Sequence, residues 1–472
     1  MSTVHLMIGI PGSGKTTFVK KLKRTVKGKN YQLVSTDIVR KNNPGIDEKE
    51  VWPYVYKTAA EYLNQGVDVI FDATNTTPKV RDRLKDNLKQ YIEDFDIVAY
   101  YFPTDYKICT QRVIERNKKR NALYLPPELP ESYGKNIIPP TYQEGFKEVK
   151  VVSQAKDLLK GLILDPYQGY AFYYREKDKV IEEYSGFESV NTNKPIRENS
   201  CFRLASVSKQ FIAYAIMTLI EENSLSYDTT LYSLFNDMPE YTKNITIYHL
   251  LHHTSGLYDY EDMEHTDEQI NDYDVLDFIR ETNGTYFEIG SKYQYSNTAY
   301  VILGIIIEKI LYLRTGIYLD QAIFSKLGMN DSKANYQGET EFENRAFGHV
   351  LVNGKLVEKD QYWCSATIGD GGIYSNIVDL KKWLYFLSVT DYDRLKKTMF
   401  KPNIINGVNT EYGLGIRIKN IKGHEVIYHC GSTIGTRTIV GFIKDLDIEF
   451  IFLTNINGNS SDKLIENIMK KH

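Results

Sequence analysis

The segment Gly9-Ile-Pro-Gly-Ser-Gly-Lys-Thr16 is the feature that most constrains how this chain folds. The run Val4–Gly9 before it is almost continuously apolar, as buried parallel strands are, and Lys15–Val26 after it has a helical pattern. Between a strand and a helix, the spacing G-x-x-x-x-G-K-[ST] lets backbone N–H groups and the helix N-terminus surround a phosphate. We expect Lys15 to neutralise the outer phosphates of ATP and the Thr16 hydroxyl to bind Mg²⁺. The loop residues predicted to contact the nucleotide are Gly9, Gly12, Ser13, Gly14, Lys15, Thr16 and Thr17.

Apolar runs alternate with amphipathic stretches over the first 155 residues. This alternation of predicted strands and helices indicates a doubly wound α/β domain with a parallel sheet. The further predicted strands are Gln32–Thr36, Val67–Asp72 and Phe95–Phe102. The further predicted helices are Glu48–Asn64, Pro78–Ile92 and Tyr106–Lys119.

Two aspartates end the second and third predicted strands, at Asp37 and Asp72. Ligands bind at the carboxyl ends of strands in such sheets, so Asp37 is a candidate base for an acceptor hydroxyl and Asp72 a candidate metal or acceptor ligand. The alternative for each is a carboxylate that caps a helix. Further along, basic side chains recur every four residues and share one helix face, which predicts a lid over the phosphates or, alternatively, a solvated basic face. The lid residues are Arg112, Arg116 and Arg120.

Together with Arg40, the Asp72-Ala-Thr-Asn75 segment and the tail Pro140–Val149, these motifs resemble the polynucleotide-kinase-like P-loop kinases over residues 1–153. The resemblance implies ATP-dependent phosphorylation of a hydroxyl, with Asp37 as general base and Arg40 near the acceptor. Relatives of this type act on nucleic acid 5′ ends, sugars or antibiotics, so the acceptor stays open. Residues 1–150 carry a net charge of +7 and the remainder −10, which favours an anionic acceptor such as a nucleic acid end.

A different pattern begins near residue 169. The sequence predicts a β-hairpin formed by Tyr170–Tyr174 and Val180–Tyr184. A long helix is predicted from about Ser206, and further strands are predicted after a helical middle. We predict one α+β domain whose sheet joins its two ends. The returning strands are Gly413–Ile418, Glu425–Tyr428, Thr436–Phe442 and Ile448–Leu453. The predicted domain division is 1–155, a short connection over 156–168 that keeps the domains close, and 169–472.

Ser206-Val-Ser-Lys209 sets a hydroxyl and an amine at positions i and i+3, on one helix face. A serine beside a buried lysine can act as a nucleophile, because the amine can take its proton. Tyr295-Ser-Asn297 and His429-Cys-Gly431 follow in order, and each of the three motifs is common by itself. Their order and neighbouring sequence carry the prediction, including Leu250–Leu257 and Gly371–Ser375.

In that order the motifs are similar to the class C β-lactamase, D-alanyl carboxypeptidase and esterase family over residues 165–468. The resemblance implies a serine β-lactamase/transpeptidase-like fold and an acyl-enzyme on Ser206, with Lys209 and Tyr295 moving its proton. It also implies that Asn297 binds the substrate amide or ester, and that Gly431 lets a strand edge pass close to the substrate. The backbone N–H groups of Ser206 and Ser432 would form the oxyanion hole.

His429 stands where many members of this family carry lysine. Histidine is mostly neutral near pH 7, so the anchor for a substrate carboxylate is weakened, which disfavours β-lactam and D-Ala-D-Ala substrates. The start of the chain lacks a basic leader region, and the apolar run Tyr300–Leu313 contains Glu308 and Lys309. We therefore expect a cytoplasmic enzyme, with no membrane partner, that acts on a small ester or amide. The four isolated cysteines favour neither zinc nor disulfides.

The leading hypothesis is a bifunctional enzyme, an ATP-dependent kinase and a serine hydrolase in one chain. A second hypothesis makes the first domain a nucleotide sensor that regulates the hydrolase. A third makes the second domain a binding module without catalysis, although the joint presence of Ser206, Lys209 and Tyr295 argues against it. Phosphate transfer to a panel of hydroxyl compounds separates the first two.

Overall fold

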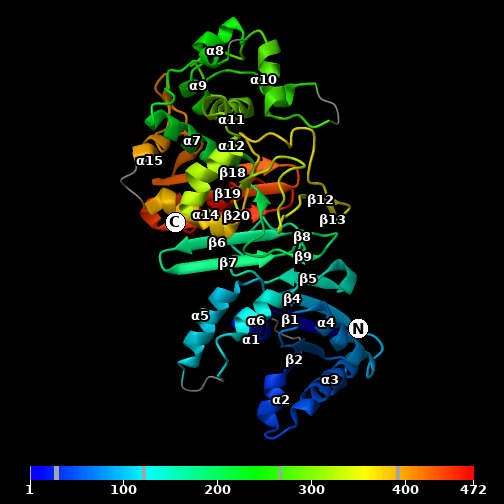
Figure 1. Cartoon of the computed structure of the whole chain (residues 1–472). Helices are drawn as coiled ribbons and strands as arrows, with labels where there is room; N and C mark the ends of the chain where they lie inside the picture. The colour runs from blue at the N-terminus through cyan, green and yellow to red at the C-terminus, as the bar shows by residue number, and fades with distance from the viewer. Residues whose placement is uncertain (1, 26–30, 120–123, 236, 265–267, 390–393) are drawn as a thin grey trace.

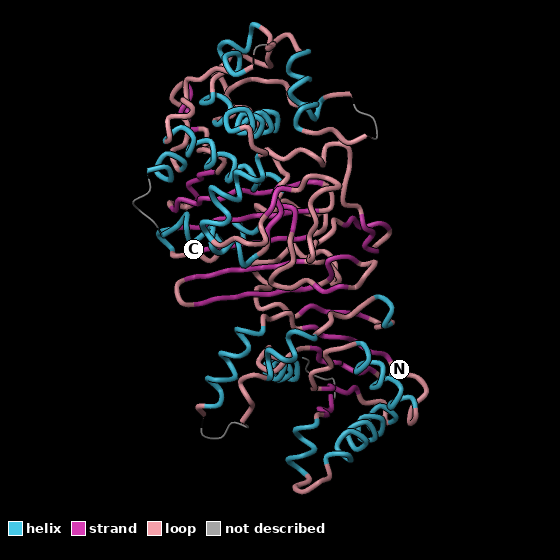
Figure 2. The backbone as a smooth tube through the Cα atoms, viewed as in Figure 1, coloured by secondary structure: helices cyan, strands magenta, loops and turns pink. Residues whose placement is uncertain are grey.

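The computed structural model describes residues 2–25, 31–119, 124–235, 237–264, 268–389 and 394–472. Figure 1 shows two units stacked end to end, the first from the blue end of the chain and the second from green to red. In Figure 2 the strands of both units lie in the middle of the molecule, and the helical middle of the second unit forms its far end.

The first unit is a parallel five-stranded sheet with strand order β2-β3-β1-β4-β5. All four strands predicted from apolar runs are present, and the sheet gains a fifth strand at its edge. The strands are β1 (Thr3–Ile8), β2 (Tyr31–Val34), β3 (Asp68–Phe71), β4 (Asp96–Tyr101) and β5 (Glu148–Val151).

Helices cover both faces of this sheet, which confirms the doubly wound fold class. Val19 of α1 (Lys15–Thr25) packs with Met7 and Tyr100 on one face. On the other face, α3 (Glu48–Asn64) and α4 (Pro78–Lys89) pack against alternate residues of the same strands. The remaining helices of this unit are α2 (Thr36–Asn42), α5 (Tyr106–Asn117) and α6 (Leu129–Asn136). The sequence did not predict α2 or α6, because both helices are short and lack a long apolar stripe.

A fully buried arginine ties α4 to the segment before β5. The Arg81 guanidinium pairs with Glu144 at 2.5 Å and also donates to the carbonyls of Asn75, Ile138 and Pro139. Glu144 in turn accepts the backbone N–H of Thr141 at 2.9 Å. The pair therefore closes the loop at the carboxyl edge of the sheet, where ligands bind in such folds.

Glu144→Ala is expected to lower the unfolding free energy of the first unit by about 3–5 kcal/mol, because it leaves a buried guanidinium without its carboxylate. Hydrogen exchange of the β1 and β3 amides, which exchange only when this unit unfolds, measures the change. Glu148→Ala is the control, since Glu148 pairs with Lys150 in solvent and its loss should cost below about 1 kcal/mol. Equal losses in the two variants would contradict the expectation.

The second unit is built on a six-stranded sheet with strand order β17-β18-β19-β20-β6-β7. As predicted, the hairpin from the start of this unit joins the strands from its end, and β20 pairs with β6. The predicted strand Gly413–Ile418 begins only at Arg417, because Gly415 at φ +68° turns the chain beneath the carbonyl of Lys209. The strands are β6 (Tyr170–Glu176), β7 (Lys179–Ser185), β17 (Arg417–Ile421), β18 (His424–Thr433), β19 (Thr436–Ile443) and β20 (Ile448–Thr454).

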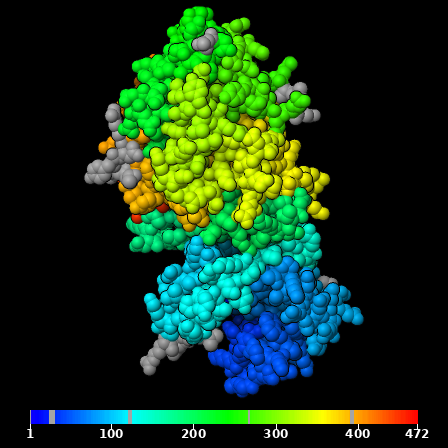
Figure 3. All heavy atoms as spheres, viewed as in Figure 1, coloured from blue at the N-terminus to red at the C-terminus, as the bar shows by residue number. Residues whose placement is uncertain are grey.

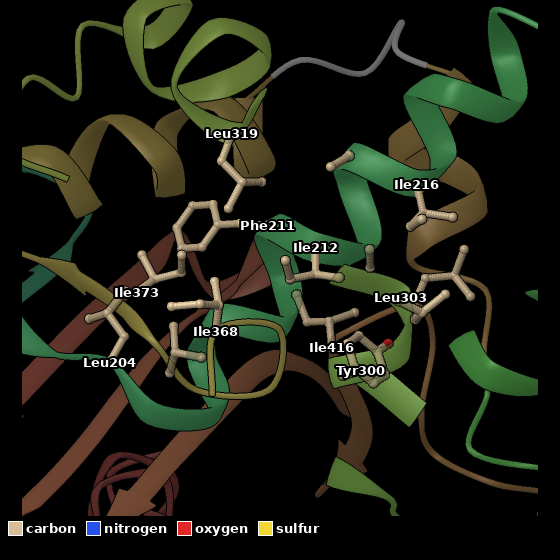
Figure 4. Packing of buried hydrophobic residues seen from close by; sticks show 14 of the residues in the cluster. Leu204, Phe211, Ile212, Ile216, Tyr300, Leu303, Leu319, Ile368, Ile373 and Ile416 are labelled. Carbon is tan, nitrogen blue, oxygen red and sulfur yellow. The ribbon is translucent and has the colours of Figure 1, made fainter. Parts of the chain in front are cut away.

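A helix without exposed apolar residues forms the centre of the main core. In α7 (Lys209–Glu221), Phe211, Ile212 and Ile216 are completely buried. Figure 4 shows them packed among Leu303 of α11 (Asn297–Leu311), Leu319 and Ile416. The core thus fixes the backbone that carries Ser206 and Lys209 at the start of this helix.

Shorter elements complete the second unit. The helices are α8 (Leu231–Leu234), α9 (Ile247–Leu251), α10 (Asp272–Glu281), α12 (Thr315–Leu319), α13 (Ser325–Leu327), α14 (Ile377–Val389), α15 (Arg394–Met399) and α16 (Lys463–Met469). The short strands are β8 (Phe187–Ser189), β9 (Lys194–Pro195), β10 (Phe202–Arg203), β11 (Lys333–Ala334), β12 (His349–Val352), β13 (Lys355–Glu358), β14 (Ile373–Ser375), β15 (Ile404–Ile405) and β16 (Val408–Asn409). Among the described residues, no helix combines the length and the apolar character needed to span a membrane.

The connection between the units packs onto the second sheet instead of forming a tether. Leu158, Leu159 and Leu162 are buried with Leu464 and Ile465 of α16 and with that sheet. The outer edge of β7 then meets the loop after β4, where Tyr184 N donates to Pro103 O and Asp105 N donates to Glu182 O, both at 3.0 Å. Backbone pairing of this kind fixes how the two units sit against each other.

Candidate functional site

Ser206 lies in a tight turn between β10 and α7, the 3₁₀ segment Ala205–Ser208. Ala205 adopts φ +48°, a left-handed conformation that is unfavourable for a residue with a Cβ. The surrounding packing must hold this strained residue in place, since Ala205 and Val207 are both buried. The turn directs the Ser206 side chain into a cavity of about 40 Å³.

The amine of Lys209 is completely buried and contacts three oxygens. Its Nζ lies 3.1 Å from Ser206 Oγ, 2.8 Å from Asn297 Oδ1 and 2.8 Å from the carbonyl oxygen of Asp370. A protonated amine would donate to all three. An unprotonated amine has two N–H bonds for the two carbonyl-type acceptors and a lone pair for the serine hydroxyl. The geometry therefore suits a proton acceptor for Ser206.

Asn297 is oriented by an acidic segment that the sequence did not single out. Its Nδ2 donates to Glu261 Oε1 at 3.0 Å, which leaves Oδ1 for Lys209. Its backbone N–H donates to Asp259 Oδ2, also at 3.0 Å. Ser296 caps the helix that Asn297 begins by accepting the N–H of Ala299. The amide is thereby held with its oxygen toward the Lys209 amine.

Tyr295 lies beside Lys209 without a hydrogen bond to it. The Lys209 Nζ is 5.0 Å from the centre of the Tyr295 ring, and the phenol oxygen is buried with no partner among the described residues. His253 stacks on the ring at 4.4 Å, and its Nδ1 accepts the N–H of Ser296. Thus His253 supports Tyr295, and the phenol hydroxyl is left available to a substrate or a water molecule.

His429 is buried behind this group and does not line the cavity. Its Nε2 lies 3.0 Å from the Tyr412 hydroxyl and its Nδ1 2.7 Å from the Cys430 carbonyl oxygen. Burial, together with the nearby charges of Arg417 and Lys209, holds the pKa of the imidazole well below its ordinary value. The ring is therefore neutral and offers no charge to a substrate carboxylate.

The end of β18 passes very close to the turn that carries Ser206. A Cβ on Gly431 would lie 2.1 Å from Leu204 O and 2.2 Å from Thr438 Oγ1, so only glycine fits. Beyond Tyr428 this strand has no partner on the β17 side, which leaves residues 429–433 as an edge. Ser432 and Thr433 of this edge line the same cavity as Ser206. The oxyanion hole formed by the backbone N–H groups of Ser206 and Ser432 stays a prediction.

Three charged residues of this cavity were missed by the sequence prediction. Glu261, Asp370 and Arg203 all line it. Asp370 Oδ2 accepts the Tyr260 hydroxyl at 2.9 Å, whereas Oδ1 is buried without a partner among the described residues. Burial raises the pKa of the Glu261 carboxyl above its ordinary value, and the nearby carboxylates of Asp259 and Asp370 raise it further. Asp370 directly precedes the Gly371-Gly372 motif, but nothing in a single sequence distinguishes Glu261 or Arg203.

The glycine-rich loop of the first unit joins β1 to α1, as predicted. Gly12 and Gly14 adopt φ +84° and +101°, and a Cβ on Gly12 would lie 2.6 Å from Cys109 O. Lys15 folds back onto the loop, with Nζ 2.8 Å from Gly9 O and 2.9 Å from Ile10 O. Burial lowers the pKa of its ammonium to about 8, against the opposing effect of Asp72 and other groups. Ser13 is buried and Thr17 is exposed.

The acidic candidates gather at the carboxyl edge of this sheet. Asp72 directly follows β3, and its Oδ2 lies 3.5 Å from the Thr16 hydroxyl. Asp37 lies in the first turn of α2, not at a strand end, with 71% of its side chain exposed. The helix cap is Ser35, whose hydroxyl accepts Ile38 N, so capping does not occupy Asp37. Arg40 lies 3.5 Å from Asp37 and also pairs with Glu48.

Of the predicted lid arginines, Arg112 reaches the loop. Its guanidinium lies 3.5 Å from Gly12 O and 2.5 Å from Gln154 Oε1. Arg116 lies one turn further along α5 and is half-buried. Arg120 lies outside the described residues, so the structure bears on two of the three.

The fold and the Ser206–Lys209 pair define a protein of the serine β-lactamase and penicillin-binding class. The chain belongs to the beta-lactamase family, whose model matches residues 165–470, and an AAA domain model matches residues 4–129. It is 30% identical over 300 residues to penicillin-binding protein 4* of Bacillus subtilis, covering 59% of this chain and 66% of that protein. It is 24% identical to a D-aminopeptidase of Brucella anthropi, covering 62% of this chain and 57% of that protein. The chain thus spans less than two thirds of the length of these relatives.

Solved structures share the fold of the second unit. A penicillin-binding protein from Bacillus halodurans matches with a TM-score of 0.57 and 23% identity, over 64% of this chain and 95% of that one. A D-amino acid amidase from Ochrobactrum anthropi SV3, complexed with L-phenylalanine amide, matches with a TM-score of 0.54 and 22% identity, over 64% and 94%.

Gly431→Ala is expected to lower the rate of fluorophosphonate labelling of Ser206 by about 100-fold, because the added Cβ must push the β18 edge away from the nucleophile. Labelling is followed by mass spectrometry of the peptide that contains Ser206. Gly458→Ala serves as the control, since its Cβ meets only the flexible end of Leu164. An unchanged labelling rate for Gly431→Ala would show that this edge is not part of the reactive site.

Proposed function

We propose that the second unit is a serine hydrolase that cleaves small amides through an acyl-enzyme on Ser206. The observation that carries this proposal is the buried Lys209 amine, whose three neighbours are two fixed acceptors and the Ser206 hydroxyl. In the first step Ser206 Oγ bonds to the carbonyl carbon while its proton passes to Lys209. The oxyanion binds the backbone N–H groups of Ser206 and Ser432.

The leaving amine then departs with a proton. The C–N bond breaks as Lys209 returns the proton to nitrogen, and the Tyr295 hydroxyl, buried without a partner among the described residues, would assist. Water attacks the acyl carbon in the second half of the reaction and loses its proton to Lys209. Release of the carboxylic acid restores the Ser206 hydroxyl, so one amide and one water yield one acid and one amine.

The charges of the cavity favour a substrate with a free ammonium beside the scissile amide. Glu261 and Asp370 oppose a single guanidinium, that of Arg203, whose Nε is already 3.3 Å from Gly371 O. Buried His429 supplies no positive charge for a substrate carboxylate. The names of the similar proteins, a D-aminopeptidase and a D-amino acid amidase, agree with a substrate that carries an α-amino group.

Glu261→Gln is expected to reduce kcat/KM for D-alanine p-nitroanilide by about 10- to 100-fold, because a charged hydrogen bond to the ammonium is lost. The same variant should leave kcat/KM for N-acetyl-D-alanine p-nitroanilide unchanged, since that substrate has no ammonium. Release of p-nitroaniline measures both, and the L-enantiomers test the stereochemical preference. Glutamine keeps an oxygen for Asn297 Nδ2, which makes it a conservative replacement.

Ser206→Ala is the control that removes all hydrolysis by this site. Wild-type preference for the N-acetylated compound, or an equal loss on both compounds in Glu261→Gln, would overturn the assignment of the amine. Residual hydrolysis in Ser206→Ala at the wild-type rate would overturn the nucleophile itself.

We also propose that the first unit is a kinase that transfers phosphate from ATP, with Mg²⁺, to a hydroxyl. Gly14 has open space where a Cβ would lie, which supports an opening for phosphates, and Lys15 and Thr16 would bind them. Thr16 and Asp72 would hold the metal, which offsets phosphate charge when bound. Exposed Asp37 would take the proton of the acceptor hydroxyl, and Arg40 would bind the acceptor. The charge of +7 over residues 1–150 favours an anionic acceptor such as a nucleic acid 5′ end.

ATP binding above pH 8 is expected to take up a proton. Burial lowers the pKa of Lys15 to about 8 in the free protein, and a bound triphosphate would raise it, so the amine gains a proton on binding. Calorimetry at pH 8.5 in Tris and in a buffer of low ionisation enthalpy measures this as a difference in heat. Lys15→Met should abolish the difference, and exposed Lys20→Met should retain it.

Transfer of labelled γ-phosphate to oligonucleotide, sugar and aminoglycoside hydroxyls then separates a kinase from a nucleotide sensor. Asp37→Asn should bind ATP normally and lose transfer. Equal heats in the two buffers for the wild type would contradict the role of Lys15, and transfer by Asp37→Asn at the wild-type rate would contradict the role of Asp37.

A further inference from the structure

A cavity of about 350 Å³ lies between the two units, apart from both sites described above. In Figure 3 the units meet along a band where cyan residues face green ones. Four aromatic side chains line the cavity, one each from the end of β4, the loop after it, the start of α5 and β7. They are Tyr101, Phe102, Tyr106 and Tyr184.

Asp105 places a carboxylate in the wall of this cavity. The residue is only 5% exposed, and its Oδ1 caps α5 by accepting Lys107 N at 2.8 Å and Ile108 N at 3.4 Å. Its Oδ2 accepts no hydrogen bond, and no cation pairs with the group, within the part of the chain that the structure describes. Burial and the nearby charge of Glu182 raise its pKa to about 6. This carboxylate is therefore buried without charge compensation.

Arg197, which is half-buried, places a guanidinium in the wall of the same cavity. Its Nη2 donates to the carbonyl of Ile137, whereas Nε and Nη1 donate to no described residue and no described carboxylate pairs with it. The other charged lining residues are compensated: Lys135 lies 2.6 Å from Glu131, and Glu198 lies 2.5 Å from Lys107. One anion and one cation thus remain unpaired in the same cavity.

We propose that this cavity binds a free α-amino acid with an apolar or aromatic side chain. Its carboxylate would pair with the guanidinium of Arg197, its ammonium with Asp105 Oδ2, and its side chain would lie among the four aromatic rings. An unpaired charge is costly when it is buried, as Asp105 is, and a zwitterion would compensate it together with the half-buried guanidinium of Arg197. A mainly apolar pocket with a few convergent polar groups at a domain interface is the usual form of a small-molecule site.

The walls of the cavity lead toward both functional sites. Ile10 of the phosphate-binding loop lines one side, and Arg197 precedes β10, which leads into Ser206. An amino acid bound here would therefore bridge the two units, and its binding energy would stabilise their contact. The proposal does not depend on the activity of either site.

Isothermal titration of the full-length Ser206→Ala protein with L- and D-phenylalanine tests this. At least one enantiomer should bind with one-to-one stoichiometry. Phenylalanine amide, which lacks the carboxylate, and N-acetylphenylalanine, which lacks the ammonium, should each bind about tenfold or more weakly. Asp105→Asn and Arg197→Gln should each raise the Kd of phenylalanine about tenfold or more.

Asparagine caps helices as well as aspartate does, so Asp105→Asn should fold even if Arg197→Gln does not. Glu261→Gln is the matched control, because phenylalanine held in the hydrolase cavity would depend on Glu261 instead. Binding that survives Asp105→Asn but is lost in Glu261→Gln overturns the proposal. The absence of heat with both enantiomers at millimolar concentration overturns it as well.

Discussion

The second unit depends on a single amine that has no contact with solvent. Lys209 Nζ joins three segments distant in sequence: the turn of Ser206, the start of α11 through Asn297, and the loop of Asp370. An ammonium or amine at such a place is tolerable only if every neighbour has the correct polarity. The core around α7 provides this by fixing the backbone of all three segments against completely buried residues. The reactive geometry is thus a consequence of packing, and the same packing tolerates the left-handed Ala205.

The distribution of charge around the Lys209 amine differs from that expected of a site that binds a substrate carboxylate. His429 is buried and neutral, so the positive charge nearest to Tyr295, besides Lys209, comes from Arg417, which lies 5.5 Å from the ring centre. The cavity itself is lined by Glu261, Asp370 and Arg203. A substrate that enters it meets more negative than positive charge. The neutral His429 and the acidic lining residues Glu261 and Asp370 thus both limit the positive charge of this site.

The sequence predicted those parts of the structure that are encoded locally. The loop Gly9–Thr16 and the Ser206–Lys209 spacing need only one helix and its entry, so pattern and chemistry were sufficient. The pairing of the first and last strands of the second unit in one sheet followed from strands at both ends of one domain. Asp37 was assigned to a strand end and lies in a short helix, α2, because seven residues carry too little periodicity to reveal a helix.

What could not be predicted depends on contacts between distant segments. Glu261 reaches the site only because Tyr260 N donates to Thr298 and Asp259 accepts Asn297 N, and Asp370 contributes a carbonyl that any residue type would supply. No residue type marks such positions in a single sequence. The same is true of the contact between the units, which rests on backbone pairing at the edge of β7.

That contact gives the Gly9–Thr16 loop a continuous polar connection to β7 of the second sheet. The carboxylate of Glu183, fully buried on β7, accepts Gln154 N at 2.6 Å, and the Gln154 side chain contacts both Thr104 and Arg112. Arg112 in turn lies 3.5 Å from Gly12 O in the Gly9–Thr16 loop. Because Glu183 has no exposed surface, its partners cannot be exchanged for water without a desolvation cost. The relative placement of the two units is therefore set by buried polar groups as well as by apolar packing. A substitution of Arg112 would remove its hydrogen bond to Gln154, the residue whose backbone N–H also donates to Glu183 of the second sheet.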